Sequence, residues 1–339
     1  MIDHDTLLEV LELGEQRRAA RRAFLKTAGI ATMAAGGVSL LAACDANDDD
    51  QGTPPATTPP ATPAPTASQN DVDILNFALN LEYLETNYYV SSVFGTPLNP
   101  QLRTGVGTQG DVIGGRAVTF TDPTIAAYAR EIAADENQHV VFLRNQLGGA
   151  AIAMPQINID GGANGAFTAA ARSAGVIGPN ETFDPYASDE NWLLGGMLLS
   201  DVGVTAYKGS ARLINSPTIV DQAAGILAVE AYHSGLLRTM LYRKGLNAPV
   251  LRVNAGKISD ARDLLDGPID LDQGITGDQG LPASTTASNI VPADSNAIVF
   301  GRTAAQVLNI AYLNRAAVTA GGFLPNGANG NIKTSANNA

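Results

Sequence analysis

Glu136-Asn-Gln-His139 and Glu230-Ala-Tyr-His233 are two copies of one pattern, Glu-x-x-His. Each copy lies within a run that has the apolar spacing of an amphipathic helix, and residues three apart on a helix share one face. The carboxylate and the imidazole of each copy should therefore project side by side toward the core. A buried carboxylate without a partner is costly because its charged form loses hydration. A metal ion held between the two copies would offset that cost.

Apolar residues recur at helical spacing in four segments, at about 71–90, 123–147, 189–213 and 218–244. The third and fourth segments are separated by a few residues, whereas the second and third are joined by the long connection 150–189. In a four-helix bundle, a connection of that length crosses the whole bundle. We therefore expect an all-α bundle in which the second and third helices are parallel and the other sequential neighbours are antiparallel.

The C-terminal part of the chain has a mixed pattern. A short helix is expected near 257–265 and a last one near 303–313, with turn-rich sequence between them. We assign 71–250 to the bundle and 251–339 to an irregular and helical extension packed on it.

The first seventy residues have the features of an export signal and a tether. Arg21-Arg-Ala-Phe-Leu-Lys26 resembles a twin-arginine signal, an apolar run follows it, and Leu41-Ala-Ala-Cys44 resembles a bacterial lipobox. The alternative is an N-terminal helix with a buried free cysteine. The order of the three features favours a signal peptide over 1–43 and a lipid on Cys44. Residues 44–70 then form a Pro/Thr-rich linker that holds the domain beside a membrane of the cell envelope.

Composition excludes several classes of function. Lys plus Arg total 21 and Asp plus Glu total 33, a formal net charge of −12, so a nucleic-acid partner is not expected. The single cysteine permits neither an intrachain disulfide nor a thiolate metal cluster. The 45% hydrophobic content is that of a globular protein. The oligomeric state stays open.

The order of acids and Glu-x-x-His units along the four helices resembles that of ferritin-like di-iron and di-manganese bundles. The sequence also resembles the ferritin-like desiccation-related proteins. The stretches that carry this second resemblance are Leu75-Asn-Phe-Ala-Leu-Asn-Leu-Glu-Tyr-Leu-Glu85, Phe183-Asp-Pro-Tyr186, Asp201-Val-Gly-Val-Thr-Ala-Tyr207, Val229-Glu-Ala-Tyr-His233 and Gly321-Gly-Phe-Leu-Pro-Asn-Gly-Ala328. It implies a ferritin-like bundle and a role in desiccation or oxidative stress.

Carried over by position, the resemblance implies six metal ligands: Glu82, Glu136, His139, Asp201, Glu230 and His233. Glu82 is preferred to Glu85 on the first helix because Tyr89 follows Glu82 by seven residues, although either acid fits. Asp201 stands where the third helix usually supplies a longer glutamate. The structural alternative is that each histidine is a neutral core residue bonded to a neighbouring carboxylate.

These residues support two classes of function. In the first, a dinuclear iron or manganese site carries out chemistry on oxygen or peroxide, because carboxylates and imidazole suit those metals. In the second, the protein is a non-catalytic stress-protective scaffold or a surface-binding lipoprotein, with a vestigial or structural metal site. Metal analysis would separate the two classes, but the sequence does not choose between Fe and Mn.

Overall fold

The computed structural model describes residues 68–276 and 288–339. The predicted signal peptide 1–43, the lipid site at Cys44 and nearly all of the linker 44–70 lie outside this part of the chain. Within the described ranges, no helix is both long enough and apolar enough to cross a membrane.

Four long helices form the bundle: α2 (Gln69–Phe94), α3 (Pro123–Leu147), α5 (Asp189–Ala211) and α6 (Pro217–Gly245). Each begins after a residue whose side chain accepts a hydrogen bond from a first-turn backbone N–H: Ser68, Asp122, Ser188 and Ser216. Such caps satisfy amides that have no partner within the helix. The predicted helix positions are confirmed to within a few residues.

Helix directions follow from paired hydrogen bonds. Asn76 bonds to Ala150 and Thr86 to Glu136 between α2 and the α3 segment, and Asn70 bonds to Leu213 and Tyr88 to Trp192 between α2 and the α5 segment. In both pairs a higher number on α2 meets a lower number on the partner, so α3 and α5 are each antiparallel to α2. They are therefore parallel to each other. The predicted long crossover is confirmed.

The crossover runs along the bundle and carries some structure of its own. It contains β2 (Ile157–Ile159), which pairs in parallel with β1 (Val112–Gly114) of the preceding loop, and the short helix α4 (Ala166–Ser173). At its far end, Asp189 accepts hydrogen bonds from the backbone N–H groups of Thr121 and Asp122. This contact brings the start of α5 beside the start of α3.

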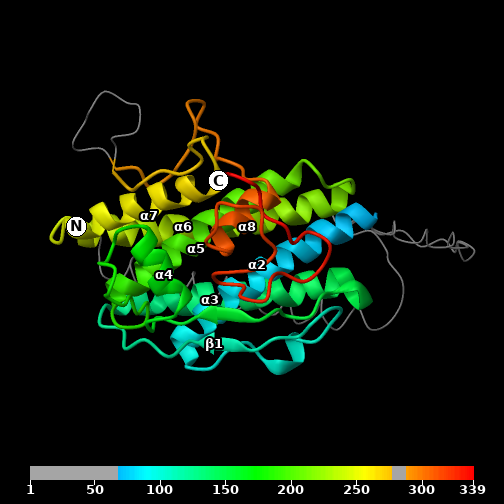
Figure 1. The fold of residues 1–339 in the computed structure, drawn as a ribbon, viewed down its shortest axis with the longest axis horizontal. Coiled ribbons are helices and arrows are strands. Elements are labelled where there is room, and N and C mark those ends of the chain that lie inside the picture. Colours follow the sequence, from blue (N-terminus) through cyan, green and yellow to red (C-terminus); the bar gives the residue numbers. More distant parts are fainter. Residues whose placement is uncertain (1–67, 277–287) are drawn as a thin grey trace, which may run out of the picture. The chain divides into compact units, whose positions relative to one another are not determined.

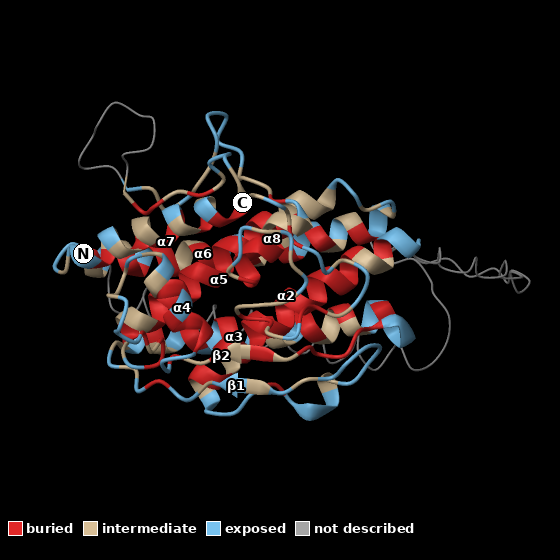
Figure 2. Cartoon of the chain, in the orientation of Figure 1, coloured by how far each residue is buried: buried red, intermediate tan, exposed pale blue. Residues whose placement is uncertain are grey.

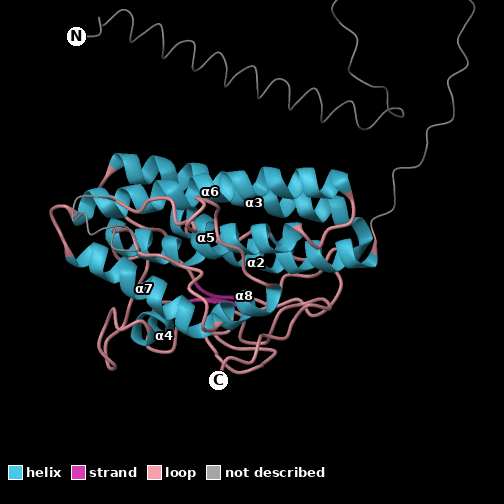
Figure 3. Cartoon of the chain, turned by 90° about the horizontal axis from the view of Figure 1, so that it is seen from above, coloured by secondary structure: helices cyan, strands magenta, loops and turns pink. Residues whose placement is uncertain are grey.

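The C-terminal extension covers one side of the bundle. Helices α7 (Val250–Asp266) and α8 (Ala304–Ala311) lie beyond α2 and α5, opposite the side formed by α3 and α6 (Figure 3). Helix α7 is longer than predicted, since it begins directly after Pro249, whose φ of −54° suits a helix start. Helix α8 begins with a capping box formed by Thr303 and Gln306.

Helix α2 lies at the centre of the molecule. Most of its residues are buried, whereas α3 and α6 alternate buried and exposed positions (Figure 2). Polar side chains on α2 bind the segments that cover it: Asn80 exchanges two hydrogen bonds of 2.9 Å with the backbone of Asn329. The acids of α2 are consequently enclosed on both sides, by the bundle and by the extension.

Candidate metal centre

Four of the predicted ligands meet inside the bundle. Glu82 of α2, Glu136 and His139 of α3, and Glu230 of α6 each offer a ligand atom, and these atoms all lie within 4.8 Å of one another. All four residues are buried, with exposed fractions between 0% and 8%. The helical spacing of each Glu-x-x-His unit accounts for this, because it places acid and imidazole on the same inner face. We call these four residues, together with Glu85 and His233, the cluster.

His233, the fifth predicted ligand, lies at the edge of the cluster. Its Nδ1 is 3.0 Å from Glu136 Oε1, and its Nε2 is 3.2 Å from Oδ2 of Asp135, a half-exposed acid of α3. Metal-binding histidines commonly donate their second ring N–H to a carboxylate, which sets the tautomer and the orientation of the ring. Asp135 occupies that position and leaves Nδ1 directed toward the cluster.

Glu85 belongs to the cluster together with Glu82 rather than in place of it. It is 5% exposed, and its pKa is raised by burial and then by the nearby carboxylates of Glu230, Glu136 and Glu82. Helical geometry explains the pairing, because residues 82 and 85 are three apart on α2. The sequence treated these two acids as alternatives, whereas the same spacing would have allowed both.

Asp201 is a correction to the predicted ligand set, because the structure does not bring it into the cluster. Its Oδ2 accepts hydrogen bonds from Arg238 at 2.8 Å and from Arg262 at 2.9 Å, and its Oδ1 accepts one from Ser234 at 2.5 Å. Two guanidinium groups neutralise this carboxylate and lower its pKa despite its burial. Asp201 is therefore part of a buried ion network.

The residue of α5 that faces the cluster is Gly203, whereas the resemblance to ferritin-like bundles predicted that α5 would contribute the acid Asp201. A Cβ atom at Gly203 would lie 2.7 Å from Glu230 Oε2 and 2.9 Å from Glu85 Oε1, which is closer than side-chain packing allows. Tyr207, one turn further along α5, donates a hydrogen bond of 2.5 Å to Glu82 Oε1. Helix α5 thus supports the acids of α2 and α6 without supplying a carboxylate of its own. Sequence reasoning did not identify either role.

Burial and mutual proximity shift the pKa values of the cluster residues away from their usual values. Burial raises the pKa of Glu82 from its usual 4.5 to about 8, and it also raises the pKa of Glu230. Glu136 differs: burial would raise its pKa, but the neighbouring imidazoles of His139 and His233 outweigh burial and lower it to about 2. Burial alone would lower the pKa of His139, yet the surrounding carboxylates, with Glu82 foremost, raise it instead.

Several polar atoms of the cluster lack partners, and this observation tests whether a metal fits. Among the described residues, no hydrogen bond is made by Glu82 Oε2, Glu85 Oε2, Glu136 Oε2, Glu230 Oε2 and His139 Nδ1, although His139 Nδ1 lies 3.3 Å from Glu82 Oε2 and 3.8 Å from Glu136 Oε2. An unpaired buried polar atom costs about 1–3 kcal/mol, and more when it is charged. Five such atoms in one place are the oxygen and nitrogen donors that Fe or Mn prefers. The residues present therefore fit a metal site.

The metal-free protein should lose stability as the pH rises from about 5 to about 9. The folded-state pKa values of Glu82, Glu85 and Glu230 are raised, so above about 4.5 the folded chain binds more protons than the unfolded chain. His233, whose pKa is raised from 6.5 to about 10 by Asp135 and Glu136 against the effect of burial, acts in the same direction above about 6.5.

Urea denaturation in the presence of a chelator would measure this dependence. The free energy of unfolding should fall from pH 5 to 7 to 9, and the slope should be shallower in a Glu82→Gln variant. A free energy of unfolding that rises over this interval would show that the acids are not held in a proton-binding cluster.

Comparisons with known proteins agree with this geometry. A family model described as a ferritin-like domain matches residues 70–243. The chain is 28% identical to the ferritin-like catalase Nec2 of Nesocodon mauritianus over 271 residues, which is 77% of this chain and 84% of that protein. It is 30% identical to the desiccation-related protein PCC13-62 of Craterostigma plantagineum over 244 residues, 69% of this chain and 75% of that protein. No solved structure matches. The chain therefore belongs to the ferritin-like family and is related to its desiccation-related members.

Proposed function

We propose that the protein is a metal-dependent peroxide-decomposing enzyme whose cluster holds two Fe or Mn ions. The observation that carries the proposal is the convergence of Glu82, Glu136, His139 and Glu230 within 4.8 Å, with Glu85 and His233 beside them. Five buried polar atoms of these residues make no hydrogen bond among the described residues. Four carboxylates balance two divalent ions when both imidazoles are neutral. The similarity to a protein named as a ferritin-like catalase supports peroxide as the substrate.

Glu82, Glu136, His139, Glu230 and His233 would hold the ions, and Glu85 would complete the set from the α2 side. Bound ions of this kind supply Lewis acidity and a reversible change of redox state. In the overall reaction two hydrogen peroxide molecules give two water molecules and one dioxygen, so that one peroxide is reduced and the other oxidised. No other electron donor or acceptor is needed.

The chain supplies positioning and exclusion of water. Tyr207 fixes the orientation of the Glu82 carboxylate through a hydrogen bond of 2.5 Å, and Asp135 fixes the His233 ring at 3.2 Å. The cluster residues are at most 8% exposed. A dry, preorganised site strengthens every electrostatic interaction within it.

Oxygen release from hydrogen peroxide tests this function. The protein expressed with added Fe or Mn should release oxygen at a rate proportional to its metal content, and a chelated sample should release none above the background. His139→Gln is the informative variant, because it removes one donor while leaving the four acids. A metal-loaded protein with no peroxide turnover would favour the non-catalytic alternative.

A second proposal concerns the location of the protein. We infer that it is exported and anchored by a lipid on Cys44, because the twin-arginine pattern, the apolar run and the lipobox occur in the required order. Export in the folded state would also allow metal to be loaded before translocation. The Cys44→Ala variant should be released from membranes. If it stays with the membrane fraction after washing in high salt, lipid anchoring is wrong.

A further inference from the structure

A small apolar cavity lies beside the cluster, between α2, α5 and α8. It is lined by nine apolar residues and one acid: Leu81, Leu84, Leu198, Leu199, Val202, Val307, Ile310, Ala311, Phe323 and Glu85. The cavity has a volume of about 20 Å³. Since about 10–15 Å³ suffices for one water molecule, the cavity admits a molecule of about two heavy atoms.

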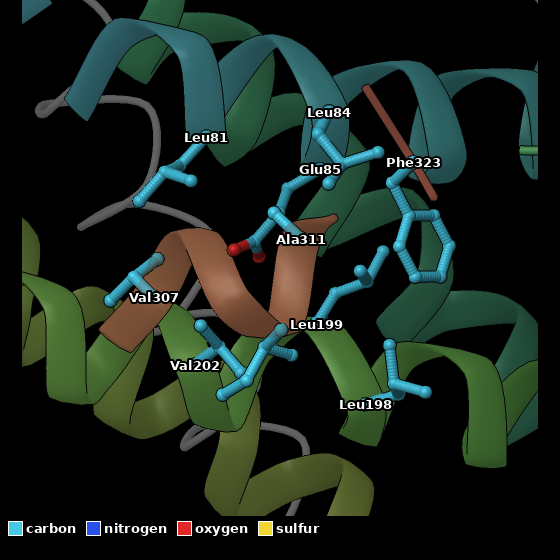
Figure 4. A pocket seen from close by; sticks show the side chains of 10 residues that line it. Leu81, Leu84, Glu85, Leu198, Leu199, Val202, Val307, Ala311 and Phe323 are labelled. Atoms are coloured by element: carbon cyan, nitrogen blue, oxygen red, sulfur yellow. The ribbon is translucent and has the colours of Figure 1, made fainter. Parts of the chain in front are cut away.

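Glu85 connects this cavity to the cluster. Figure 4 shows its carboxylate directed away from α2, toward Val307 and Ala311 of α8 and Val202 of α5. Its Oε2 has no hydrogen-bond partner among the described residues. Its Oε1 lies on the Gly203 side, where Glu230 Oε2 also lies. The Glu85 carboxylate thus lies between the cluster acids and the apolar side chains that line the cavity.

The residues that line the cavity disfavour a charged guest. None of the lining residues is a cation, so an anion would find no counter-charge on the cavity lining and would be poorly solvated there. An apolar wall leaves a small uncharged molecule with little hydration to replace. The single carboxylate offers one polar contact in an otherwise apolar enclosure.

We propose that this cavity is the substrate site of the centre, that it takes a small uncharged molecule containing an O–O bond, and that the Glu85 carboxylate is its polar contact. The inference rests on the proposed function. It extends that function by placing the substrate on the α8 side of the cluster. The C-terminal extension thereby becomes a wall of the active site, through Val307, Ala311 and Phe323, as well as a cover for the bundle.

Filling the cavity tests the proposal, and the chain offers a matched control. Ala311→Leu places three additional carbons in the cavity, and Ala311→Val is a milder version if the first variant folds poorly. The control is Ala261→Leu, which fills a second cavity of about 20 Å³ lined by Ala170, Ser173, Ala174, Leu198, Ile258, Ala261, Arg262, Leu265, Ile310 and Leu313, with no carboxylate. Metal content, measured by mass spectrometry, should be equal in all these proteins.

Three probes distinguish the possible guests. Xenon binding, followed by nuclear magnetic resonance, reports on the empty cavity without any metal. Peroxide turnover tests hydrogen peroxide as the guest, and the uptake of dioxygen by the Fe(II)-loaded protein tests dioxygen as the guest. In Ala311→Leu, we expect loss of xenon binding at this cavity. We also expect an increase of about tenfold or more in the KM for peroxide, in the dioxygen concentration needed for half-maximal Fe(II) oxidation, or in both. Ala261→Leu should change neither.

The wild-type protein should also discriminate by size, consuming hydrogen peroxide but not tert-butyl hydroperoxide. Equal effects of Ala311→Leu and Ala261→Leu on both oxygen substrates, with metal retained, would overturn the inference and leave the proposed function standing. A wild-type protein without bound metal or peroxide turnover would instead overturn the proposed function. Xenon binding would then still report whether the cavity is open.

Discussion

Replacing both Glu136 and Glu230 with glutamine should abolish metal binding at the cluster. Glutamine keeps the shape of the side chain and removes the charge, so the cluster would retain only the carboxylates of Glu82 and Glu85 against two divalent ions. Two positive charges would then be left unbalanced in a site whose residues are at most 8% exposed. Elemental analysis after expression with added Fe and Mn should find no more metal than in a chelated sample.

Two controls make this result specific. Glu131→Gln changes an exposed acid on the same helix and should leave the metal content unchanged. Asp201→Asn should also leave the metal content unchanged, because the Asp201 carboxylate accepts hydrogen bonds from Arg238 and Arg262 and does not face the cluster. Metal loss in Asp201→Asn equal to that of the double variant would mean that the acid of α5 is a ligand after all. Metal retained by the double variant would remove the basis of the enzyme proposal.

Replacing Arg262 with methionine should lower the free energy of unfolding by about 3–5 kcal/mol. Its guanidinium donates to Asp201 at 2.9 Å, to Asp272 at 2.6 Å and to the backbone oxygen of Met197 at 2.8 Å, and its side chain is 2% exposed. Removing it leaves two buried carboxylates short of a partner. Each carboxylate would then lose part of the pairing that offsets its desolvation.

The matched control is Arg243→Met, which breaks an exposed pair with Asp122 at 3.4 Å. The Arg243 side chain is 61% exposed, and exposed pairs contribute about 0–1 kcal/mol. Urea denaturation followed by circular dichroism should separate the two variants clearly. If Arg262→Met unfolds within about 1 kcal/mol of the wild type, the buried network contributes less than its geometry indicates.

This network also links the C-terminal extension to the bundle. Arg262 of α7 and Arg302, just before α8, both bind Asp272, while Arg302 also donates to Asp266 at 2.5 Å and to the Thr205 hydroxyl of α5 at 3.0 Å. The charged side chains involved are at most 4% exposed. The extension is consequently held against α5 by ion pairs as well as by apolar packing, and this keeps α8 in place as a wall of the cavity.

The sequence by itself determined the bundle, the crossover and most of the cluster. Helical periodicity is local, so the helical segments could be predicted from the sequence, and three-residue spacing placed each Glu-x-x-His unit on an inner face. A long connection between the second and third helices left one topology that a bundle readily accepts. Glu82, Glu136, His139 and Glu230 meet as expected because each depends only on its own helix facing the core.

Only the tertiary structure decided which remaining acids belong to the cluster. Asp201 and Glu85 are both buried acids on core helices, and periodicity does not distinguish a carboxylate that faces a metal from one that faces an arginine. Arg238 and Arg262, distant in sequence, pair with Asp201, while Gly203 leaves room for Glu85 beside Glu230. The partner of a buried charge is chosen by long-range packing, which leaves no periodic pattern along the chain.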